Sequence, residues 1–95
     1  MSLINTTIEE RGSRYGSFEG QSAYAQELKV ILRSAPQWQR MRSSQKESLE
    51  MIMHKVARIL NGDPDYSDSW HDIAGYAKLI DDVLIKENAE VGYER

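Results

Sequence analysis

Residues Glu47 to Tyr76, ESLEMIMHKVARILNGDPDYSDSWHDIAGY, contain the two strongest helical patterns of this protein and the turn between them. Before the Asn-Gly-Asp-Pro turn at residues 61–64, apolar residues recur with the spacing of one helix face: Leu49, Ile52, Met53, Val56, Ile59 and Leu60. After the turn a second set recurs in the same way: Trp70, Ile73, Ala77, Ile80 and Leu84. The pattern predicts a helix over 44–60, capped by a Ser44–Glu47 box and ended by Asn61-Gly62. A second helix is predicted from Ser67 or Asp68 to about Glu87.

The rest of the chain adds two shorter predicted helices, over 3–11 and 22–34. The first carries Thr6 and Glu9 as a capping-box pair, and Pro36 stops the second. Between them, GSRYGSFEG (12–20) has the glycines of a loop, which is either a ligand loop or a connector pinned by its two aromatics. Trp38 is expected to anchor the link 36–42 to the core, and 88–95 should be frayed. The sequence therefore predicts one all-α domain over 1–95, an antiparallel bundle of about four helices.

Composition limits the function classes. The 95 residues carry a net charge of −3 and no cysteine. The acidic balance argues against a nucleic-acid-binding surface, which needs a basic face. The absence of cysteine excludes thiolate metal sites and fits a reducing compartment. No window has the ~18 consecutive apolar residues of a membrane span, so we expect a cytoplasmic protein.

Acidic and histidine side chains gather on both sides of the central turn. A helix advances about 100° per residue, which puts Glu47, Glu50, His54 and Arg58 on one strip, nearly opposite the apolar stripe. This strip is either the solvated face of an amphipathic helix or a site covered by another helix or subunit. Glu50 and His54 also have the spacing of an ordinary surface pair.

The second helix of the hairpin carries Asp68, Asp72, Gly75 and Leu79 on one strip, flanked by Tyr76 and Val83. Carboxylates beside apolar residues need a partner cation if they are buried. Asp68 also fits a helix cap, whereas Asp72 lies one turn further in. Gly75 costs about 1 kcal/mol against alanine in mid-helix, so it is expected to permit close backbone approach.

These side chains offer mainly oxygen ligands, a set that suits Mg²⁺ or Mn²⁺ better than zinc. We therefore expect a metal site formed by Glu50, Asp68 and Asp72. The chain has no phosphate loop and no GxGxxG motif. Asp63, Asp65 and Ser67 have the spacing of a calcium loop but lack its glycine and terminal glutamate.

Two segments, ERGSRYGSF (10–18) and LEMIMHKVARILNGDPDYSDSWHDIAGYAKL (49–79), resemble small phage and prophage proteins. Those are similar to the MazG-like all-α nucleoside-triphosphate pyrophosphohydrolases, including domains linked to phage nucleotide modification. The resemblance covers about residues 9–84. It implies a dimeric or tetrameric bundle that splits a (d)NTP with Mg²⁺, in the host cytoplasm if the protein is phage-encoded. The first family motif, ExxE, is present as Glu47-Ser-Leu-Glu50, but the second is altered to Asp68-Ser-Trp-His-Asp72, and His54 is no part of the general motif.

Under this hypothesis Glu47 or His54 is the catalytic base. The substrate contacts are Arg14, Lys55 and Arg58 for the phosphates and Tyr15 for the base or sugar. For each of these four, a surface or packing role is the competing interpretation. The alternative function is a non-catalytic phage accessory protein that acts as a helical interaction module.

Overall fold

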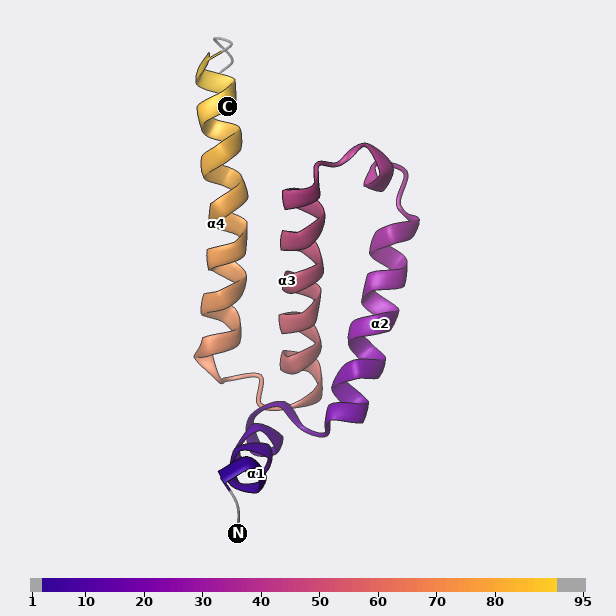
Figure 1. The fold of residues 1–95 in the computed structure, drawn as a ribbon, viewed down its shortest axis with the longest axis vertical. Coiled ribbons are helices and arrows are strands. Elements are labelled where there is room, and N and C mark those ends of the chain that lie inside the picture. The colour runs from indigo at the N-terminus through magenta and orange to yellow at the C-terminus, as the bar shows by residue number, and fades with distance from the viewer. Residues whose placement is uncertain (1–2, 91–95) are drawn as a thin grey trace.

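The computed structural model describes residues 3–90 and is all-α over that range. Its elements are α1 (Leu3–Tyr15), α2 (Phe18–Ser34), the 3-10 turn η1 (Trp38–Arg40), α3 (Ser43–Asn61) and α4 (Ser67–Glu90). Figure 1 shows α2, α3 and α4 as an antiparallel row, with α1 below it. The predicted all-α architecture of about four helices is confirmed.

The central helix of the row is α3, which packs against α2 on one side and α4 on the other. Small residues let these helices approach closely, because interaxial distance depends on the side chains at the contact. Ala25 and Ala57 are buried, as are Ser48 of α3 and Ser69 of α4. The Glu47–Tyr76 hairpin is thus the two-helix unit that the sequence predicts.

The N-terminal segment differs from the prediction. Residues 12–15 continue α1 and residues 18–20 already belong to α2, so the expected loop over 12–20 shrinks to Gly16 and Ser17. Glycine favours a loop, but Gly12 has open space around it and is tolerated inside α1. Ser17 caps α2, since its Oγ accepts a hydrogen bond from the Gly20 amide at 3.0 Å.

Two predicted capping boxes and one helix end are also wrong. Thr6 lies inside α1, which begins at Leu3. Because α3 begins at Ser43, Ser44 lies within it, and the Gln45 side chain accepts a hydrogen bond from the Arg42 amide at 3.1 Å instead. Residues 88–90, expected to fray, continue α4. The remainder of that predicted tail, 91–95, lies outside the described residues.

The core is small. Trp38 is buried, as predicted, and Lys46 lies 5.7 Å from its ring centroid. The other buried apolar residues among 3–90 are Ala25 and Ala57, and no large side chain in this range is fully buried. Because the helices form a single row, most apolar side chains remain partly exposed to solvent. None of the helices between residues 3 and 90 is long and apolar enough to cross a bilayer.

Candidate functional site

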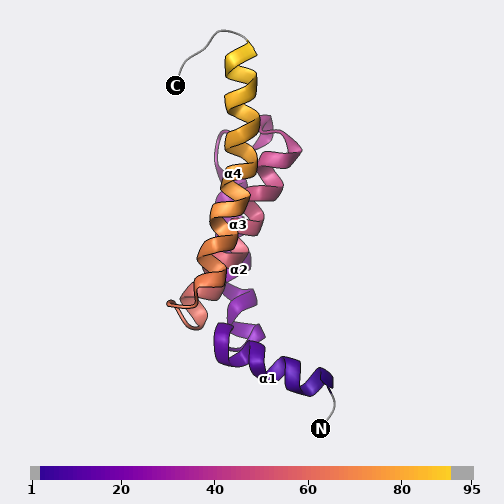
Figure 2. The same cartoon turned by 90° about the vertical axis from the view of Figure 1, so that its left-hand side faces the viewer.

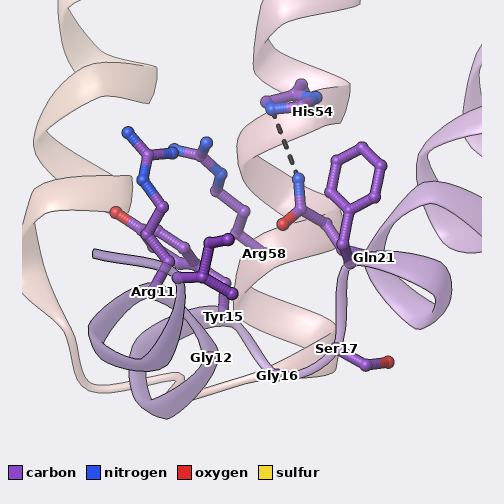
Figure 3. A pocket seen from close by; sticks show the side chains of 10 residues that line it. Arg11, Gly12, Tyr15, Gly16, Ser17, Gln21, His54 and Arg58 are labelled. Atoms are coloured by element: carbon purple, nitrogen blue, oxygen red, sulfur yellow. Dashed lines mark hydrogen bonds between the residues drawn. The ribbon is translucent and has the colours of Figure 1, made fainter. Parts of the chain in front are cut away.

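A cavity of about 450 Å³ lies where α1 and the start of α2 meet α3. Figure 3 shows side chains from all three helices around it. Its lining residues are Ile8, Arg11, Gly12, Tyr15, Gly16, Ser17, Phe18, Gln21, His54 and Arg58. They combine cationic and aromatic groups, and none is acidic.

The α1–α2 link is held against the end of α3 by Asn61. The Asn61 side-chain amide donates hydrogen bonds to the carbonyls of Tyr15 (2.8 Å) and Ser17 (2.9 Å). Between those carbonyls, Gly16 has φ of 75°, a conformation that favours glycine. A Cβ at Gly16 would also lie 2.2 Å from the Asn61 carbonyl oxygen. These contacts position α1 beside α3 and so form the cavity.

The following turn tightens the same junction. The Asp63 amide donates to the Arg14 carbonyl at 2.8 Å. A Cβ added to Gly62 would lie 2.3 Å from that oxygen, so only glycine fits. Asn61-Gly62 does end α3 as predicted, with the Gly62 amide bonded to the Arg58 carbonyl. Asn61 and Gly62 also hold the end of α1 against the end of α3.

Two arginine–tyrosine pairs lie side by side at this junction. The Arg58 guanidinium lies 4.2 Å from the Tyr15 ring centroid, and Arg14 lies 4.6 Å from that of Tyr66. The two tyrosine rings are 6.1 Å apart at their centroids. Cation–π contact orients Arg58 without neutralising its charge.

Arg58 is incompletely satisfied. Its Nε is buried and has no hydrogen-bond partner among the described residues. Arg11 lines the same cavity, and Figure 3 shows both guanidinium groups among its side chains. A guanidinium has five N–H donors in a planar arrangement that matches phosphate and carboxylate. The cavity therefore has the charge and donors to receive an anion.

His54 lies on the α2 side of the cavity. Its Nε2 is 3.3 Å from Gln21 Nε2, a donor amide, so the ring nitrogen accepts. Burial, followed by the positive charges of Arg58, Lys29 and Lys55, lowers the pKa of His54 below its ordinary value. A neutral imidazole is therefore favoured near pH 7.

The carboxylates of the predicted metal site do not come together. Glu50 pairs with Arg33 of α2. Asp72 Oδ2 lies 3.0 Å from Lys55 Nζ on the opposite flank of α3, and Asp68 accepts a hydrogen bond from the Tyr66 hydroxyl at 2.8 Å. Within residues 3–90 no three acidic, histidine or cysteine side chains form a group able to hold a metal ion. The donors that residues 3–90 bring together therefore do not fit Mg²⁺ or Mn²⁺.

The remaining predicted residues divide between two regions. His54, Tyr15 and Arg58 line the cavity, and Arg14 lies next to it on Tyr66. Lys55 faces α4 and Glu47 is exposed. A Cβ at Gly75 would meet nothing within 4 Å, so the expected close backbone approach does not occur in this chain.

Sequence reasoning missed Arg11 and Gln21. Arg11 precedes Tyr15 by four residues, so both lie on one face of α1. Gln21 is buried at one end of a helix face that continues with Ala25 and Leu28. A polar residue in such a face was the available signal, because a buried amide needs a partner.

Comparisons with curated proteins and with solved structures give no match. A family model does match residues 2–84, under the description "domain of unknown function (DUF6378)". This match spans the helices that form the cavity and most of α4. The protein therefore belongs to the DUF6378 family.

Proposed function

We propose that the protein binds a nucleotide in the cavity between α1, α2 and α3. The observation that carries the proposal is the Arg58 guanidinium: its buried Nε has no hydrogen-bond partner within residues 3–90, and the cavity that it lines has no acidic residue in its lining. Arg58 and Arg11 would receive phosphate oxygens. The resemblance to MazG-like proteins favours a nucleoside triphosphate among the possible nucleotides.

The lining supports a ligand with both an anionic and an aromatic part. Ile8, Tyr15 and Phe18 form an apolar side, and the two arginines with His54 form a polar side. Stacking of a base on an aromatic ring contributes about 1–3 kcal/mol. The volume of about 450 Å³ is within the common range for small-molecule sites, ~300–1,000 Å³.

His54 and Gln21 supply the remaining polar contacts. In the neutral His54 ring, Nε2 accepts a hydrogen bond from Gln21, so Nδ1 carries the proton and can donate. Gln21 keeps its carbonyl oxygen available for a base or sugar. Both groups come from rigid helices, α3 and α2, which reduces the ordering cost of binding.

The resemblance also implies hydrolysis with a divalent ion, for which the described part of the chain does not supply a fitting carboxylate group. The binding proposal uses none of Glu47, Glu50, Asp68 or Asp72. Pyrophosphate release from a nucleoside triphosphate with Mg²⁺ or Mn²⁺, abolished in Asp72→Ala, would add hydrolase activity to the proposed binding.

The test is titration calorimetry with ATP, dATP and GTP in EDTA, together with thermal shifts. A ligand present at 100 times its Kd raises the free energy of unfolding of the protein by about 2.7 kcal/mol. Arg58→Ala should weaken binding by about tenfold or more, since hydrogen bonds to charged groups contribute ~1.5–3 kcal/mol. Arg40→Ala, on η1 and outside the cavity lining, is the control.

No heat and no thermal shift with any of these nucleotides would overturn the proposal. So would equal affinity of the wild type and Arg58→Ala. Inorganic triphosphate should bind more weakly than ATP if Tyr15 and Phe18 contact the base. Tyr15→Ala should then remove that difference.

A further inference from the structure

The row of helices has two broad faces of different chemistry. The polar face is defined by three contacts that cross between neighbouring helices: Arg33 with Glu50, Gln21 with His54, and Lys55 with Asp72. The cavity opens beside this face, since His54 and Arg58 line it, and α1 lies there. In Figure 2, viewed from the α4 edge, α1 leaves the row to one side.

The opposite face is apolar. At about 100° per residue, Leu49, Met53, Val56 and Leu60 lie roughly opposite the strip of Glu50, His54 and Arg58 on α3. The same rotation, taken in the reverse sense on the antiparallel neighbours, places Tyr24 and Ile31 of α2 and Trp70 of α4 on this side. We define the apolar face by Tyr24, Ile31, Met53, Val56, Leu60 and Trp70.

Nothing in residues 3–90 covers the apolar face. Tyr24, Ile31, Leu60 and Trp70 are exposed, whereas Met53 and Val56 at its centre are half-buried. Stable domains bury the apolar stripe of each helix between at least two layers, and this row supplies one. A chain of 95 residues has little other core to compensate.

We propose that a second copy of this chain covers the apolar face, so that two rows form a symmetric, two-layer, six-helix assembly. The size of the face fits this occupant. A helix of 19 residues is ~28 Å long, and three helices ~8–10 Å apart span ~25 Å, which gives roughly 700 Å². A standard interface needs about 800 Å² on each partner.

The chemistry fits a permanent self-interface better than a transient one. The three α3 residues of the apolar face, Met53, Val56 and Leu60, are uncharged, and depletion of charge at the centre is typical of homodimers. A two-fold axis through the apolar face brings the same surface of both copies together, and such an interface is complete with two copies. The interface therefore makes a dimer, not the tetramer that the sequence left open, and keeps both cavities accessible.

The chain contains matched positions for a test. Leu60 on the apolar face is 60% exposed and Leu79 on the polar side of α4 is 62% exposed. On α2, Ile31 at 68% and Val30 at 63% form a second pair, with Val30 on the outer edge of the row. Glutamate at each position adds the same charge at nearly the same exposure.

The experiment is sedimentation equilibrium at micromolar concentration, with circular dichroism to verify helix content. The wild type should have twice the chain mass of 10.9 kDa. Leu60→Glu and Ile31→Glu should weaken dimerisation at least tenfold, whereas Leu79→Glu and Val30→Glu should stay dimeric. If Leu60→Glu reduces the helix content, the comparison of Ile31→Glu with Val30→Glu tests the interface instead.

A monomeric wild type would overturn the inference, as would dissociation by the two control variants equal to that of the test variants. The result does not depend on nucleotide binding, because the cavity lies on the other side of the row. Saturating ATP should leave the measured mass of the protein assembly unchanged. A ligand-induced dimer would place the interface elsewhere.

Discussion

The Asn61 side chain at the end of α3 holds the Tyr15 carbonyl at the end of α1, at 2.8 Å, and thereby fixes α1 beside the cavity. The same amide also holds the Ser17 carbonyl. One side chain thus satisfies two backbone acceptors at a helix–helix link, where α1 has no intrahelical partners left to offer. Residues 46 positions apart in the chain become one structural unit.

Asn61→Ala should destabilise the fold and weaken ligand binding together. Loss of the Asn61 amide leaves the partly buried Tyr15 carbonyl unpaired, at a cost of about 1–3 kcal/mol, whereas the exposed Ser17 carbonyl still accepts from the Gln21 amide. Urea denaturation followed by circular dichroism measures the first effect, and calorimetry with ATP the second. Gln39→Ala, at an exposed position of η1, is the control and should change neither. An unchanged urea midpoint for Asn61→Ala would contradict the assigned role.

Two glycine-to-alanine substitutions should change the stability of the protein in opposite directions. At Gly62 a Cβ would meet backbone atoms of Arg14 and Tyr15 at 2.3–2.5 Å, so Gly62→Ala should cost about 1–3 kcal/mol or more through overpacking. At Gly75 a Cβ meets nothing within 4 Å, so Gly75→Ala should stabilise α4 by about 1 kcal/mol. Thermal and urea unfolding at one fixed protein concentration compare them. Destabilisation by Gly75→Ala would indicate close packing at that position in the assembled protein.

Asp72→Asn should destabilise the α3–α4 contact. The Lys55 side chain is only 12% exposed, whereas that of Asp72 is 44% exposed and partly screened, so we expect a loss of about 1 kcal/mol. The exposed Lys78–Asp82 pair on α4 is the control, and Asp82→Asn should cost no more than about 0.5 kcal/mol. A double-mutant cycle with Lys55→Met isolates the pair energy.

The same variant separates an ion pair from a metal ligand. If Asp72 serves only Lys55, Mg²⁺ should leave the Tm of the wild type unchanged. A rise in Tm with Mg²⁺ that Asp72→Asn abolishes would instead support the metal role expected from the sequence, with further ligands supplied by another chain.

Stability should fall on the acid side because of His54. Burial and neighbouring cations lower the pKa of His54 in the folded protein, while the unfolded chain keeps the ordinary value near 6.5. Below about pH 6.5 the unfolded state therefore binds more protons, so stability decreases as pH falls towards the folded pKa. His54→Gln should flatten this decrease between pH 7 and 5 in urea denaturation, whereas exposed His71→Gln should not. Identical profiles for the wild type and His54→Gln would refute the assignment.

Periodicity alone predicted the two helices of the central hairpin, because each has an apolar stripe at helical spacing. The Asn-Gly-Asp-Pro turn between them contains residues that end a helix. The same reasoning failed at 12–20, where Gly12 lies inside α1 and Gly16 alone marks the break. It also placed Glu50, Asp68 and Asp72 in one metal site, since spacing along a helix shows which residues share a strip but not which neighbour faces that strip.

The sequence alone thus predicts the helical class, the Asn61-Gly62 helix end, the anchoring of Trp38 and the candidates Tyr15, His54 and Arg58. It does not predict that α2 and α4 lie on opposite flanks of α3, which depends on how the helices pack. That arrangement sends Glu50 to Arg33 and Asp72 to Lys55, and it brings Arg11 and Gln21 to the cavity. Local patterning determines each helix, whereas side-by-side packing of the helices determines which charged side chains meet.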